Sequence, residues 1–164
     1  MSAARILIAG IGNVFFGDDA FGVEVARRLA QLPLPDGVRV VDFGIRALDL
    51  TYALLDPYEV AILVDAAPRG GSVGTVYVLE PELDQPSAPG SALELHSMDP
   101  VKVLRLAREL GSTLKRVLLV GCEPGPLPSD DDIHAEISAP VQAAVDEATN
   151  LIKSLVTQIL TNSS

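Results

Sequence analysis

The chain has 164 residues, 48% of them hydrophobic, which suits a folded protein with a buried core rather than a disordered one. Its 22 acidic and 12 basic residues give a formal net charge of -10. This charge argues against partners that need a basic face, namely nucleic acid and anionic membrane surfaces. The single cysteine, Cys122, excludes an internal disulfide and fits a reducing compartment. The chain also lacks a recognisable signal peptide and a membrane-length apolar run, so we expect a cytoplasmic protein.

Short apolar runs alternate with stretches of helical periodicity along the chain. The fourth apolar run follows the third too closely for a helical crossover, so we expect it to run antiparallel at a sheet edge. The pattern predicts an α/β fold, a three-layer α/β/α sandwich around a five-stranded, mostly parallel sheet. We expect one domain over 1–160 and a frayed tail at 161–164. The predicted elements are, in order, strand 5–9, helix 20–32, strand 38–41, helix 48–55, strands 60–64 and 75–79, helix 100–110, strand 116–120 and helix 140–160.

A glycine-rich turn, residues 10–22, joins the first strand to the first helix. Such a turn usually suggests a phosphate cradle. Here Asp18 and Asp19 stand where a pyrophosphate would lie, so the turn suits a cation better than an anion. Asp42 ends the second strand, where a dinucleotide-binding fold holds a ribose, but Phe15 occupies the position of that fold's third glycine. A nucleotide-binding module is therefore a less favoured alternative.

Polar side chains follow several of the predicted strands. Asp19, Asp42 and Asp65 come after the first, second and third strands, and the carboxyl ends of parallel strands meet at one edge of a sheet. His96 lies in the connection after the fourth strand and could fold over the same edge. Carboxylate and imidazole ligands suit divalent transition metals such as nickel or zinc. Asp19, Asp65 and His96 would form an incomplete set that leaves coordination positions open for a substrate.

Each of these residues also has a simpler structural interpretation. Asp19 could favour a helix N-terminus, and Asp65 could cap a turn. His96 taken alone is typical of a surface histidine, and His134 in an aspartate-rich loop is expected to be solvated. We interpret Cys122 as a small buried thiol rather than a nucleophile, since no base is implied beside it.

The order and spacing of the motifs resemble those of the hydrogenase maturation endopeptidases, which trim the large subunit of nickel–iron hydrogenases. The resemblance extends over nearly the whole chain. The first metal-ligand position holds Asp19, where many members of that family have a glutamate. The matching segments are Gly12-Asn13-x4-Asp18-Asp19-x2-Gly22, Asp42-Phe43-Gly44-Ile45, Val64-Asp65-Ala66, His96, Gly121-Cys122-Glu123-Pro124 and Ile137-Ser138.

The resemblance implies a metal-dependent endopeptidase that removes a C-terminal extension from the precursor of a hydrogenase large subunit after nickel insertion. It implies Asp19, Asp65 and His96 as metal ligands, and Asp42 as a residue of substrate recognition or cleavage. The nickel is expected to come with the substrate, while zinc or cadmium is expected to bind the site in vitro. A nickel-binding assembly partner without proteolytic activity remains an alternative at this point.

Overall fold

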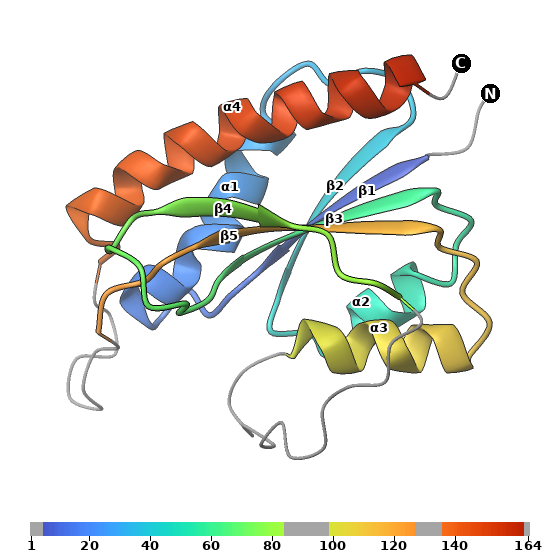
Figure 1. Ribbon diagram of the computed structural model, residues 1–164, viewed down its shortest axis with the longest axis horizontal. Coiled ribbons are helices and arrows are strands. Elements are labelled where there is room, and N and C mark those ends of the chain that lie inside the picture. Colours follow the sequence, from blue (N-terminus) through green and yellow to red (C-terminus); the bar gives the residue numbers. More distant parts are fainter. Residues whose placement is uncertain (1–4, 84–98, 127–135, 163–164) are drawn as a thin grey trace.

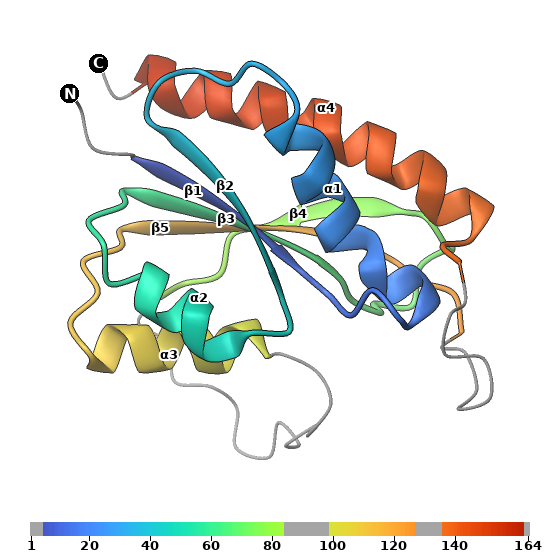
Figure 2. The same ribbon diagram turned by 180° about the vertical axis from the view of Figure 1, so that it is seen from behind.

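The computed structural model describes residues 5–83, 99–126 and 136–162. A five-stranded sheet lies between two pairs of helices, α1 with α4 on one face and α2 with α3 on the other (Figure 1; Figure 2 shows the opposite side). The strands are β1 (Ile6–Ile11), β2 (Val38–Gly44), β3 (Val60–Ala66), β4 (Val76–Leu79) and β5 (Arg116–Cys122). The helices are the 3-10 turn η1 (Gly17–Ala20), α1 (Phe21–Ala30), α2 (Ala47–Ala53), α3 (Pro100–Glu109) and α4 (Ala139–Asn162).

The strand order is β2-β1-β3-β5-β4, and every neighbouring pair is parallel except β4 with β5. The predicted α/β sandwich with an antiparallel edge strand is therefore confirmed. The chain moves outward from β1 to β2 and then returns to β3 on the other side of β1. The first two helices consequently lie on opposite faces of the sheet. The strand order reverses between β1 and β3, and open α/β sheets bind ligands at such a point of reversal.

Two hydrophobic cores follow from the alternation of side chains along the strands. Ile6 and Ile8 of β1 pack with α1 and α4, whereas Leu7 and Ala9 pack with α2 and α3. The central strands are buried on both faces, which explains their continuous apolar runs. The same alternation fixes the face on which each polar residue at the strand ends lies.

The bounds of several elements differ from those predicted. Strands β2, β3 and β5 continue to Gly44, Ala66 and Cys122, because backbone pairing extends past the apolar residues that marked them in the sequence. Asp99 caps α3, accepting a hydrogen bond from the Val101 amide at 3.0 Å. Helix α4 ends at Asn162, so two residues of the predicted frayed tail are helical. None of the helices in the described ranges is long and apolar enough to cross a membrane.

Gly22 sets how closely α1 approaches the sheet. A Cβ atom at this position would lie 2.1 Å from the Val64 carbonyl oxygen and 2.3 Å from that of Ile11. No side chain fits at these distances, so only glycine allows α1 to rest directly on β1 and β3. This close approach holds the turn before α1 against the end of β3.

Candidate functional site

Asp19 and Asp65 lie together where the strand order reverses, between β1 and β3. Asp65 is the penultimate residue of β3, and Asp19 belongs to η1, which follows the adjacent strand β1. Burial is the main cause that raises the pKa of Asp65, and the negative charge of Asp19 adds to the rise, so the two carboxylates are close enough to interact. The structure thus brings together two of the four site residues named from the sequence.

Burial dominates the electrostatics of this pair. It raises the pKa of Asp19, and a hydrogen bond from the Asn13 amide to Asp19 Oδ2 at 2.9 Å only partly opposes the rise. It raises the pKa of Asp65 well above the usual value, with the charge of Asp19 adding to the effect and the Ala66 amide opposing it. A cation between the carboxylates would relieve their repulsion, so this donor pair fits a divalent metal ion.

The remaining proposed ligand, His96, lies outside the described residues, and so does His134. Within the described ranges, no cluster of three or more histidine, cysteine, aspartate or glutamate side chains could hold a metal ion. The described part of the site is therefore a pair of carboxylates.

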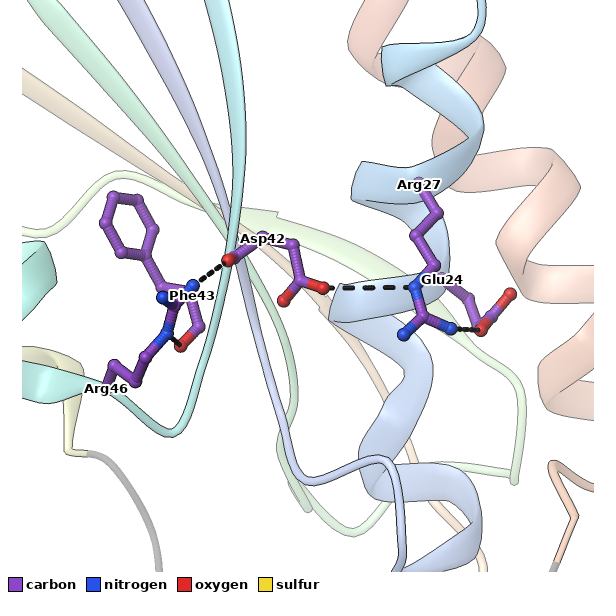
Figure 3. A network of polar contacts seen from close by, with 5 residues as sticks. All are labelled: Glu24, Arg27, Asp42, Phe43 and Arg46. Atoms are coloured by element: carbon purple, nitrogen blue, oxygen red, sulfur yellow. Dashed lines mark hydrogen bonds and ion pairs between the residues drawn. The ribbon is translucent and has the colours of Figure 1, made fainter.

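Asp42 lies on the other face of the sheet from Asp65. Its side chain points toward α1, where Oδ2 is 3.8 Å from Nε of Arg27, and Arg27 also contacts Glu24 Oε1 at 3.0 Å (Figure 3). Side chains alternate between the two faces along each strand. Asp42 shares the face of Val38 and Val40, which is the α1 side, whereas Asp65 shares the face of Ala61 and Leu63, which is the α2 side.

The segment around Asp42 is held by its backbone. The register shifts between Gly10 and Ile11, which pair with Asp42 and Gly44, so Phe43 bulges out of β2. Arg46 donates hydrogen bonds to the carbonyl oxygens of Asp42 and Phe43, which fixes this bulge from the opposite side (Figure 3). Asp42 therefore occupies a rigid position at the edge strand, on the other face of the sheet from Asp65.

The glycine-rich turn is built for packing and not for a phosphate. A Cβ atom on Gly12, whose φ is +152°, would lie 2.0 Å from the Asp19 carbonyl oxygen. The Asn13 amide, which a phosphate would need as a donor, is bonded to the carboxylate of Asp19. The turn therefore positions Asp19 and offers no free anion cradle there.

Asp18 has a role that sequence reasoning did not assign. Its buried carboxylate accepts hydrogen bonds from the Gly125 amide at 2.8 Å, the Ser138 amide at 2.7 Å and the Ser138 hydroxyl at 2.9 Å. It joins η1 to the residues after β5 and to the start of α4. Ser138 is 120 positions away in the chain, so this contact could not be predicted from local sequence. The one available signal was the pair of adjacent aspartates, of which one could have a structural role.

Glu123 and Cys122 also serve the structure at this edge. Glu123 is buried and accepts hydrogen bonds from the Arg69 amide at 2.6 Å and the Gly70 amide at 3.2 Å, so it shapes the loop after β3. Cys122 is buried, as expected, and burial is the main cause that raises the pKa of its thiol to about 11. A thiol with this pKa is protonated at neutral pH, which disfavours a nucleophilic role.

Comparison with known proteins identifies relatives of this chain and of its fold. A family model described as "Hydrogenase maturation protease" matches residues 23–155. A putative hydrogenase maturation protease of Methanocaldococcus jannaschii is 31% identical, over 93% of this chain and 96% of that protein. The hydrogenase expression/formation protein HupD of Rhodobacter capsulatus is 30% identical, over 91% of this chain and 71% of that protein. The solved structure of the hydrogenase maturating endopeptidase HybD from Escherichia coli is similar, with a TM-score of 0.76, 26% identity, and coverage of 94% and 93% of the two chains.

Proposed function

The chain belongs to the hydrogenase maturation protease family, and from this premise we propose that it removes a C-terminal extension from the precursor of a nickel–iron hydrogenase large subunit. Membership supports a processing endopeptidase over a nucleotide-binding module. The observation that carries the proposal is the pair of interacting carboxylates, Asp19 and Asp65, at the point where the strand order reverses.

The nickel is proposed to arrive with the substrate. Two buried, mutually repelling carboxylates are unfavourable until a cation lies between them. A structural metal site would offset this repulsion with a closed set of protein ligands. We propose His96 as the third ligand from this chain, with the precursor itself completing the set. Cleavage would then depend on nickel in the substrate, which makes the reaction a check on metal insertion.

Exposed apolar side chains at this edge support a protein as the substrate. Val14 and Phe15 follow β1, and Ile45 and Leu48 follow β2; their exposed fractions range from 41% to 61%. Exposed apolar residues grouped in two neighbouring segments that follow adjacent strands are typical of a protein contact. A folded precursor could bury these side chains while its C-terminal segment reaches Asp65.

Asp42 is proposed to act in substrate recognition or cleavage rather than in metal binding. Its side chain is 38% exposed and faces Arg27, on the other face of the sheet from Asp65. Asp42→Asn is therefore expected to impair cleavage more than it impairs metal affinity. We place the reaction in the cytoplasm, in keeping with the lone buried thiol of Cys122.

The proposal is tested by incubating the protein with a nickel-loaded, unprocessed large subunit and measuring the intact mass of the product. Wild type should remove a C-terminal segment, and Asp65→Asn should not. A nickel-free precursor should remain uncut even when zinc is added. Efficient cutting of the nickel-free precursor by zinc-loaded protein would overturn the dependence on nickel. Binding of the nickel-loaded precursor without any change of mass would instead favour a non-proteolytic assembly partner.

A further inference from the structure

The neighbours of Asp65 across the sheet are unusual. Asp65 pairs with Gly121 of β5, and Gly121 pairs with Tyr77 of β4, so the three residues form one row on the same face. Gly121 has no side chain, and a Cβ atom there would lie 2.3 Å from Cζ of Tyr77. The ring of Tyr77 therefore covers Gly121 and reaches toward the strand that carries Asp65.

The guanidinium group of Arg69 stacks on the Tyr77 ring. Its guanidinium carbon lies 5.2 Å from the centroid of the Tyr77 ring, a cation–π distance. The Tyr77 hydroxyl donates to the Ala67 carbonyl oxygen at 2.7 Å, and Glu123 accepts a hydrogen bond from the Arg69 amide at 2.6 Å. These two hydrogen bonds hold the Tyr77 ring and the backbone of the loop after β3 in place. The residue is exposed, so its charged end remains accessible to a ligand.

Arg69 differs from Arg27, Arg46 and Arg116 in the partner of its charge. Arg27 and Arg46 at the same edge form ion pairs with carboxylates, as does Arg116 at the far end of β5. No ion pair of the described part of the chain includes Arg69. Burial raises the pKa of Tyr77; the charge of Arg69 opposes this rise and that of Asp65 adds to it, which places both charges near the same phenol.

We propose that Arg69 is a substrate-binding residue that takes a carboxylate of the precursor's C-terminal segment beside Asp65. The inference rests on the proposed function for the identity of the ligand. A peptide carboxylate would be repelled by Asp19, Asp65 and the overall charge of -10, so it needs a local cation to approach. A guanidinium binds a planar carboxylate through parallel hydrogen bonds, and its stacking on Tyr77 reduces the entropy lost on binding.

The test measures the affinity of two synthetic peptides for the full chain by titration calorimetry. One peptide has the sequence of the C-terminal segment of the unprocessed large-subunit precursor, and the other is the same peptide with all its carboxylates converted to amides. Arg69→Gln should weaken binding of the acidic peptide roughly 10-fold and leave binding of the amide peptide unchanged. Arg116→Gln removes the same charge at the opposite end of β5 and should alter neither. Tyr77→Leu should resemble Arg69→Gln, whereas Tyr77→Phe keeps the ring and should retain most of the affinity.

The outcomes separate this inference from the proposed function. If wild type does not prefer the acidic peptide, or if Arg69→Gln weakens both peptides equally, the role of Arg69 is wrong even where the precursor is cut. If the precursor is not cut but the charge-dependent binding is lost in Arg69→Gln, the proposed function fails and the binding role stands. In the cleavage assay, Arg69→Gln should raise KM with little change in kcat, because the contact binds the substrate equally before and during the reaction.

Discussion

Replacement of Asp18 tests whether a single buried carboxylate holds the turn, β5 and α4 together. Asp18→Ala leaves the donors of Gly125 and Ser138 without their acceptor in a site where Asp18 is only 7% exposed. A hydrogen bond to a charged group contributes about 1.5–3 kcal/mol. Partial rescue by water reduces the sum for such contacts, so we expect Asp18→Ala to lower the free energy of unfolding by about 3–5 kcal/mol.

Two further variants show which hydrogen bonds account for the loss of stability in Asp18→Ala. Asp18→Asn keeps the shape but turns an amide donor toward at least one of the donors of Gly125 and Ser138, which should cost about 2–3 kcal/mol. Ser138→Ala removes one hydrogen bond and keeps the one from its amide, so we expect a cost of about 1 kcal/mol.

Urea denaturation followed by circular dichroism measures all three variants. The slope of the transition should be unchanged, so that the shift in midpoint reports stability alone. A cost below about 1 kcal/mol for Asp18→Ala, or a cost for Ser138→Ala as large as that of Asp18→Ala, would refute the reasoning.

Two other predictions concern the metal-free protein. Asp65 has a raised pKa when folded, so ionisation destabilises the folded state, and this cost grows as pH rises above the usual value of 3.8. Asp65→Asn should therefore be more stable than wild type at pH 7, with the difference vanishing toward pH 3.8, and a difference independent of pH in urea titrations would contradict this. Gly22→Ala should lower stability by about 3 kcal/mol because its Cβ meets two carbonyl oxygens. Gly71→Ala, whose Cβ would have its nearest neighbour at 3.9 Å, should change the stability little in the same urea titrations. Equal costs for the two variants would contradict the steric explanation and point to backbone entropy instead.

Composition and local pattern were sufficient for the fold class. The apolar runs of β1, β3 and β5 are buried on both faces of the sheet, which is why they read as parallel strands from the sequence alone. The short connection before β4 revealed its antiparallel direction. The strand ends were placed too early, because pairing continues into Asp65 and Gly121, whose polarity or small size hid them.

The site was predictable in type but only partly in arrangement. Asp19 and Asp65 could be expected together, since both lie at the carboxyl ends of adjacent strands, at one edge of the sheet. The face of Asp42 depended on the alternation along β2, and the role of Asp18 on its contact with Ser138, which the tertiary structure alone creates. The sequence by itself determined which residues could carry the chemistry, because residue type and local periodicity are encoded along the chain. Only the tertiary structure decided which of them share a face and which serve packing, because these depend on contacts between distant segments.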